Sequence, residues 1–139
     1  QEDMISGDAL AVFGWSGDVN QLNLQNQNRF GFGLPDSGGT FSSDNMLIPA
    51  TSPNKTGAEA VMNYYYDPLV AARVSNYINY VCPVQGAQDA MAKVNPKNVK
   101  NALIFPDDKM WSQLHVFRNL SAAEQISFST SFQKVSGNA

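Results

Sequence analysis

The stretch DPLVAARVSNYI, residues 67–78, decides the character of the second half of the chain. Asp67 is a favoured N-cap residue, and Pro68 follows at the first helical position, where its missing N–H costs nothing. Leu69, Ala72 and Asn76 then fall on one stripe at helical spacing. The stretch therefore predicts a capped helix that begins at Pro68.

Further helices are predicted on both sides of this one. TGAE at 56–59 has the pattern of a capping box formed by Thr56 and Glu59, so we expect a helix there that packs firmly. Apolar residues recur at helical spacing over 84–94, and shorter helices are expected within 95–103 and 105–114. SAAE at 121–124 is a second capping box, and the helix that it opens should stop before Gly137.

The first third of the chain combines strand and helix signals. Residues 8–15, DALAVFGW, form a short apolar run typical of a strand covered on both faces. A helix capped by Ser16 or Asp18 should follow. We then expect a strand at 29–34, a turn at 35–39 and a third strand at 45–50. The sequence thus predicts an α/β fold whose C-terminal part is mainly helical.

Composition excludes several classes of protein. Nine Lys and Arg against twelve Asp and Glu give a net charge of −3, so the basic surface of a nucleic-acid-binding protein is missing. No apolar run reaches the roughly 20 residues that a membrane span needs. Cys82 and His115 are the single cysteine and histidine, which excludes a Cys/His zinc site. We expect Cys82 to pack as a small hydrophobe, and we expect no metal, no cofactor and no enzymatic activity.

Two residues stand out as ligand-binding candidates. Trp15 ends the first apolar run, just before the polar residues 16–18. Asp44 is not accounted for by a helix N-terminus and precedes an apolar strand, and strand ends are where α/β sheets present ligand-binding groups. A glycosidase would need a second carboxylate at a defined separation, and the sequence names none.

Three segments resemble a known protein family: SGDALAVFGWSGD at 6–18, the long stretch from MLIPATSP to GAQDAM at 46–91, and ALIFPDD at 102–108. In kind and order they resemble the C-terminal part of bacterial spermidine/putrescine-binding proteins, the solute receptors of polyamine ABC transporters. The resemblance implies a two-lobed periplasmic-binding-protein fold of type 2 that closes on its ligand. Residues 1–44 would then hold the last βαβ unit of the second lobe and the return crossing. Residues 45–139 would hold a strand plus helices that pack on the first lobe, with the upstream part of the protein lying outside the sequence given.

The resemblance also implies a ligand site. Trp15 matches a tryptophan whose ring lies against the polyamine, Asp44 a carboxylate that pairs with an amine, and Tyr80 a tyrosine that lines the cleft. Two positions depart from the family pattern. Ser42 stands where the family has a second tryptophan, and Phe117 stands near the position of a glutamine. Because of these two departures, we expect the length of the preferred ligand or the affinity for it to differ from those of the family.

Polyamine chemistry agrees with these residue types. A polyamine is a rod of methylene groups with ammonium groups at intervals, so its receptor needs aromatic faces for the rod and carboxylates for the cations. The expected partners are putrescine or spermidine and an ABC-transporter permease, without nucleic acid. Membrane contact is expected only through a lipid anchor upstream, and the expected localisation is periplasmic or extracytoplasmic.

The residues leave other functions open. A receptor of the same fold could take another solute, such as an iron complex, a sugar or an amino-acid derivative, and Ser42 in place of tryptophan keeps that open. A second alternative function is that of a non-catalytic interaction module built around the tyrosine-rich helix. A hydrolase using Asp44 and His115 is disfavoured because no nucleophile motif accompanies them.

Overall fold

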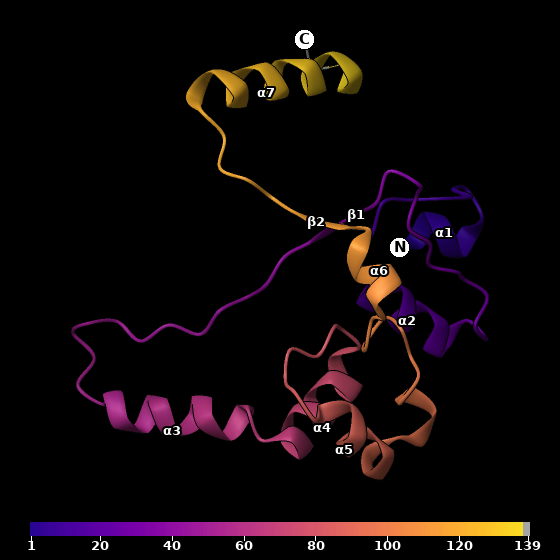
Figure 1. Ribbon diagram of the computed structural model, residues 1–139. Helices are drawn as coiled ribbons and strands as arrows, with labels where there is room; N and C mark the ends of the chain where they lie inside the picture. Colours follow the sequence, from indigo (N-terminus) through magenta and orange to yellow (C-terminus); the bar gives the residue numbers. More distant parts are fainter. Residues whose placement is uncertain (138–139) are drawn as a thin grey trace.

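The computed structural model describes residues 1–137 and is mainly helical (Figure 1). In chain order its elements are α1 (Glu2–Ser6), α2 (Ser16–Gln25), β1 (Gly39–Phe41), α3 (Lys55–Tyr65), α4 (Pro68–Ile78), α5 (Ala87–Val94), the 3₁₀ helix η1 (Pro96–Asn98), α6 (Asp108–Ser112), β2 (Leu114–Val116) and α7 (Ala122–Ser136). The prediction of a mainly helical C-terminal part is therefore confirmed. Within residues 1–137, the longest apolar helical stretch falls short of what a membrane crossing needs.

The core lies where α4 packs against α5. Its buried apolar residues, each at most 1% exposed, are Ala71 and Ala72 of α4, Ala87 and Met91 of α5, and Ile104. The small alanine side chains allow the two helices to approach closely, because interaxial distance depends on the side chains at the contact. Cys82 packs against this cluster, and its N–H donates to the carbonyl of Ile104 at 2.9 Å. The expectation that Cys82 packs as a small hydrophobe is confirmed.

Helix α4 begins and ends through local hydrogen bonds. Asp67 Oδ1 accepts from the N–H groups of Leu69 at 2.9 Å and Val70 at 3.1 Å, and Pro68 stands in the first turn, as predicted. At the other end Asn79 adopts the left-handed conformation with φ 59°, and its N–H donates to the carbonyl of Ser75 at 2.8 Å. This ending turns the chain out of the helix at Tyr80.

Asn76 joins α4 to the segment after α5. Its side-chain oxygen accepts from the amide groups of Asn95 and Asn98, each at 2.9 Å. Because all three side chains are partly buried, the shared oxygen stabilises the position of η1 against α4. Of the residues on the predicted stripe, Ala72 is buried in the core and Asn76 lies in this amide cluster.

Helix α3 differs from its prediction at its beginning and in its packing. Asn54, not Thr56, is the N-cap, and its Oδ1 accepts from the N–H of Gly57 at 3.0 Å. Glu59 therefore has no cap to reach back to and instead forms an ion pair with Lys55 at 3.4 Å. None of the residues of α3 is buried, and Figure 1 shows the helix extending away from the α4–α5 core. The expectation that this helix packs firmly is wrong.

The strands predicted at 8–15, 29–34 and 45–50 are absent from the described residues. Leu10, which should have been covered in the first of them, is 97% exposed. A strand needs a neighbouring strand to pair with, and the ladder found in residues 1–137 joins β1 to β2 and includes none of these segments. Segment 29–34 is instead held by the side chain of Asn23, which bonds to the N–H and the carbonyl of Phe30. The local sequence pattern therefore misassigned these segments.

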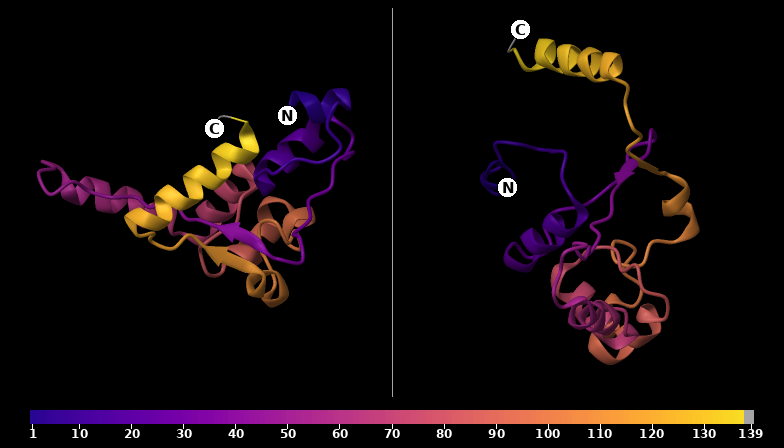
Figure 2. Two further views of the ribbon diagram at one scale, coloured as in Figure 1. Left: turned by 90° about the horizontal axis from the view of Figure 1, so that it is seen from above. Right: turned by 90° about the vertical axis from the view of Figure 1, so that its left-hand side faces the viewer.

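The observed sheet pairs β1 with β2 in parallel, with Gly39 opposite Leu114 and Phe41 opposite Val116 (Figure 2). It lies partly in the predicted 35–39 turn. Gly38 has φ 88°, and a side chain there would collide with the carbonyl of Gln113, so glycine permits the close approach of the two strands. The sheet of the described residues is two-stranded, and an α/β arrangement is present only in this reduced form.

Helix α7 matches its prediction in both boundaries. Ser121 and Glu124 form the capping box, and Gly137 ends the helix in the left-handed conformation with φ 73°. Figures 1 and 2 show α7 standing apart at the end of an extended connection from β2. None of its residues is buried, including the apolar Ile126 and Phe132. Its stability within residues 1–137 therefore depends on local contacts rather than on packing.

Replacing the core methionine tests the position of the core. Met91→Ala should lower the free energy of unfolding by about 2–5 kcal/mol, because it removes a fully buried side chain and leaves a cavity. Met46→Ala makes the same chemical change at a residue that is 46% exposed and should cost less than about 0.5 kcal/mol. Urea unfolding measures both, and equal costs would place the core elsewhere.

The capping box of α7 should respond to pH through Glu124. Hydrogen bonds from Arg118 and then from Ser121 lower the pKa of this carboxyl from 4.5 to about 2. The charged form is thus favoured in the folded helix, so its stabilisation is complete above about pH 4.5 and is lost as the pH falls toward 2. NMR shifts of the first turn of α7 should report this loosening.

Glu124→Gln is the matched control, because glutamine can still serve the capping box but does not titrate. The first turn of α7 in this variant should show no change over the same pH range. An identical pH profile in the variant and the parent protein would contradict the assignment to Glu124.

Candidate functional site

Trp15 stands immediately before α2, in extended backbone with φ −87° and ψ 145°, and not at the end of a strand. Its carbonyl accepts from the N–H groups of Asp18 at 3.2 Å and Val19 at 3.4 Å, which starts the helix. The indole plays no part in capping and is 50% exposed. A large aromatic face is therefore open at the N-terminus of α2.

Tyr80 lies against the same helix end. Its ring covers Gly17, the buried residue of α2, and its hydroxyl donates to Asp18 Oδ1 over a long 3.5 Å. A second contact, from Gln21 Nε2 to the carbonyl of Tyr77 at 3.4 Å, joins α2 to the end of α4. Tyr80 thus contacts Gly17 and Asp18 in the first turn of α2, directly after Trp15. We call Trp15, Asp18 and Tyr80 the α2 cluster.

The phenol of Tyr80 is held in its neutral form. Partial burial raises its pKa above the ordinary value of 10.0, and the negative charge of Asp18 and the hydrogen bond to it raise the pKa further. Any stability that this contact contributes is present below pH 10 and is lost as the pH rises through the raised pKa. At neutral pH the hydroxyl is therefore a donor, and Asp18 is the acceptor.

Asp18 is the functional candidate that sequence reasoning missed. It was expected only as a helix cap, but α2 has no side-chain cap bond, so the carboxylate is free to face Tyr80. No ion pair engages it among residues 1–137. A signal was present, since Asp18 follows Trp15 by three residues in WSGD, the spacing of neighbours on a helix start.

Ser42 and Phe117 meet at the other candidate position. They follow the parallel strands β1 and β2, whose register places Phe41 opposite Val116, so the next residues of each strand are also neighbours. Together with Ser43, these residues line a shallow hollow of about 210 Å³. The ring of Phe41 makes an edge-to-face contact with the ring of Trp111, and their centroids are 5.1 Å apart. The hollow offers two hydroxyls and aromatic rings but no charged side chain.

Asp44 lies two residues beyond Ser42 in an exposed extended segment, and not at the start of a strand. Within the described part of the chain it has no ion-pair partner. Hydrogen bonds and ring contacts of residues 1–137 do not connect Asp44, Ser42 or Phe117 with the α2 cluster. The sequence-predicted residues therefore form two groups in this structure.

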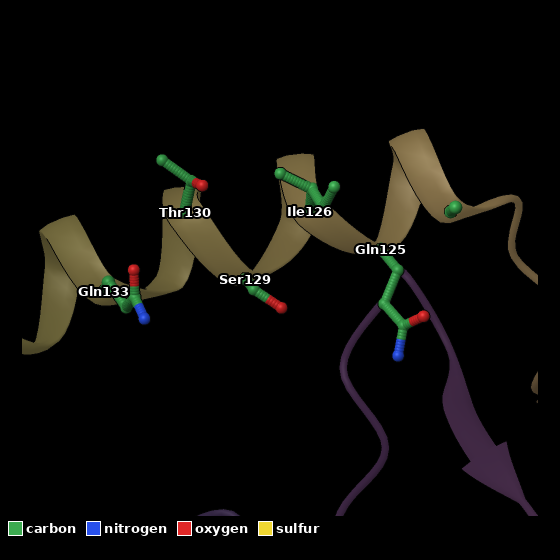
Figure 3. Close-up of a pocket in the computed structure, with 6 residues that line it drawn as sticks. Gln125, Ile126, Ser129, Thr130 and Gln133 are labelled. Atoms are coloured by element: carbon green, nitrogen blue, oxygen red, sulfur yellow. The ribbon is translucent and has the colours of Figure 1, made fainter.

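Other features of residues 1–137 carry less chemistry. His115 is exposed in β2 beside Gly38 and is not among the residues that line the hollow at Ser42 and Phe117. No group of three or more His, Cys, Asp or Glu side chains in this range is arranged to hold a metal ion. Figure 3 shows a hollow along α7, but a single helix lines it with uncharged side chains such as Gln125 and Thr130, so it is an open helix face and not a cleft.

Comparison with known proteins gives consistent matches. The sequence profile of the bacterial extracellular solute-binding protein family matches residues 1–106. The chain is 28% identical over 108 residues to a putrescine/agmatine-binding protein of Pseudomonas aeruginosa, which covers 74% of this chain and 29% of that protein. It is 23% identical over 138 residues to a putrescine-binding periplasmic protein of the same species, covering 96% and 37%. It is 31% identical over 83 residues to the putrescine-binding periplasmic protein of Escherichia coli, covering 56% and 22%.

These matches cover at most 37% of each of these curated relatives, so the chain spans well under half of their length. No solved structure matches the chain significantly. The family has a two-lobed periplasmic-binding fold, of which the described residues contain helices and one small parallel sheet.

The family match confirms the resemblance drawn from the sequence and the expected extracytoplasmic localisation. The residues of the α2 cluster, which lie within 15–18 and at 80, fall inside the range that the family profile matches. With three quarters of its residues inside the family profile, the chain belongs to the bacterial extracellular solute-binding proteins.

Proposed function

We propose that this protein is a receptor, not an enzyme, that captures a polyamine such as putrescine or spermidine outside the cytoplasm and delivers it to an ABC-transporter permease. The observation that carries the proposal is the α2 cluster. It combines an exposed indole, a neutral phenol and a carboxylate without an ion-pair partner among residues 1–137. These are the groups that a methylene rod with ammonium ends requires.

In the proposed complex the indole of Trp15 and the ring of Tyr80 contact the methylene groups and the nearer ammonium. Asp18 accepts hydrogen bonds from that ammonium and exchanges its weak bond to Tyr80 for a charge-assisted one. A cation–π contact adds about 0.5–2 kcal/mol for each well-placed ring. A cationic ligand that pairs with this carboxylate also matches the negative net charge of the chain, which is −3.

Asp44 is proposed as the carboxylate for the second ammonium, and Ser42 and Phe117 as the lining of the far end of the ligand. Asp44 is exposed and without an ion pair within the described residues, so its charge is available. Each group already joins residues of 1–44 to residues of 45–139, and closure of the two-lobed fold would bring the two groups together around the ligand. The relatives named for putrescine binding support this choice of ligand.

The uncharged hollow at the C-terminal ends of β1 and β2 supports a second candidate, a receptor of the same fold for a different small solute. Ser42 and Ser43 supply hydroxyls there while Phe41 and Phe117 supply apolar walls, a combination that suits a neutral or aromatic group better than a cation. Thermal-shift screening with cationic, anionic and neutral solutes distinguishes the two candidates. Stabilisation by a neutral solute, and not by diamines, would favour the second.

Removing the indole should weaken polyamine binding. In the protein as its source produces it, Trp15→Ala should raise the Kd for putrescine by about tenfold or more, because the aromatic face for the cation and the methylenes is lost. Trp111→Phe is the control, since it keeps an aromatic edge against Phe41 and lies outside the α2 cluster. Calorimetry measures both variants. An unchanged Kd in Trp15→Ala would remove Trp15 from the binding site, and no binding by the parent protein would point instead to an interaction module.

The two carboxylates should contribute separately. Asp18→Asn and Asp44→Asn should each weaken putrescine binding by about ten- to a hundredfold, because each replaces a charge-assisted hydrogen bond with a neutral one. Asp36→Asn removes the same charge from an exposed turn and serves as the control. The losses should be smaller for a monoamine of similar length, which has only one ammonium. Equal effects of all three variants would indicate only a general field of negative charge.

A further inference from the structure

We propose that Gly17 is a positioning residue of the proposed ligand site, because its missing side chain lets the Tyr80 ring lie on the first turn of α2, next to Asp18. This inference rests on the proposed function for its consequence in ligand binding. Its structural part, the dependence of Tyr80 on Gly17, can be tested without any ligand.

The backbone at Gly17 does not require glycine. The residue lies in the first turn of α2 and is not among the glycines with positive φ, which are Gly7, Gly38, Gly86 and Gly137. An alanine could adopt this helical conformation and would even favour the helix by about 0.5–1 kcal/mol. The reason for glycine must therefore be sought in its surroundings.

The surroundings give a single reason. A Cβ built at Gly17 would lie 2.6 Å from both Cδ2 and Cζ of Tyr80, and still closer to Cε2, and no other residue contributes to these nearest contacts. Carbon atoms pack at about 3.5–4.0 Å, so the ring and a methyl group cannot both occupy this place. The flat contact between Tyr80 and the bare backbone of Gly17 is thus what buries Gly17.

Alanine at this position would displace Tyr80 and leave the helix intact. The phenol ring is 36% exposed and can rotate outward, whereas the α2 backbone is held by its own hydrogen bonds. The hydroxyl is already 3.5 Å from Asp18, so a shift of about 1 Å would separate them. Gly17 therefore acts through Tyr80, and its replacement should affect the aromatic wall without removing any group that touches the ligand.

Gly14 provides a matched control one residue before Trp15. It has no positive φ, and a Cβ there would meet no atom within 4 Å. Gly14→Ala and Gly17→Ala thus make the same change on either side of the same tryptophan. Only the methyl group at position 17 meets Tyr80.

The experiment compares Gly17→Ala, Gly14→Ala, Tyr80→Ala and the double variant Gly17→Ala/Tyr80→Ala in the protein as its source produces it. NMR of ¹³C-labelled tyrosine reports the titration of Tyr80 without ligand, and calorimetry with putrescine reports affinity. We expect the pKa of Tyr80 to fall toward its ordinary value in Gly17→Ala and to stay raised in Gly14→Ala. Putrescine binding should weaken by about tenfold in Gly17→Ala and by less than about twofold in Gly14→Ala.

The double variant separates positioning from a general disturbance of α2. Once Tyr80 is alanine, Gly17→Ala should cause no further loss of affinity, because the methyl group has nothing to displace. An equal further loss in that background would overturn the inference. If Gly17→Ala alone does not fold, recovery of folding in the double variant supports the collision with Tyr80, and failure to recover contradicts it.

Failure of the two proposals can be told apart. If the parent protein gives no heat with putrescine or spermidine, the proposed ligand is wrong, while the titration of Tyr80 still tests the role of Gly17. If the parent protein binds putrescine but Tyr80 titrates identically in Gly17→Ala and Gly14→Ala, the positioning role is wrong and the proposed function stands.

Discussion

The contact between α4 and α5 is the constraint on which the candidate site depends. Alanines at 71, 72 and 87 let the helices meet closely around Met91, and Asn76 fixes the following segment through two amide hydrogen bonds. With α4 held, its left-handed end at Asn79 directs the chain toward α2. Tyr80 is the next residue, and Cys82, two residues further on, packs against the core, so the core holds the chain on both sides of this exposed aromatic side chain. The position of Tyr80 in the α2 cluster therefore depends on the packing of α4 and α5.

Sequence reasoning succeeded where the deciding interaction is local. The beginnings of α4 and α7 were predictable because Asp67 and Ser121 bond to N–H groups two or three residues away. The beginning of α3 was harder to predict, because Asn54 and Thr56 are both residues that can cap a helix. In the structure Asn54 is the N-cap. The strands failed for a different reason. A strand is defined by a distant partner, and the apolar run at 8–15 has no such partner, whereas the glycine-rich segment at 38–41 does.

The sequence allowed residues of the candidate site to be named, but it predicted only partly which of them lie together. Trp15 and Tyr80 were named from a resemblance, and the structure brings both to the N-terminus of α2. Asp18 was missed because a carboxylate in a first helical turn usually serves the helix itself, and only the contact with Tyr80 shows that it does not. Asp44, Ser42 and Phe117 form a separate group at the ends of the strands. Their relation to the α2 cluster depends on an arrangement of lobes that local sequence does not specify.

The weak bond between Tyr80 and Asp18 fits a site that must release its own contacts to a ligand. At 3.5 Å and partly exposed, it is worth less than the ~1 kcal/mol of a well-made neutral hydrogen bond. A hydrogen bond from an ammonium to the same carboxylate is roughly twice as strong as a neutral one. Asp18 can therefore change partners at little cost. The contact between Tyr80 and Gly17 involves ring carbons and not the hydroxyl, so in the proposed complex it does not depend on the bond to Asp18. The aromatic wall is preserved while the carboxylate is freed, which separates the rigid part of the site from the part that responds to charge.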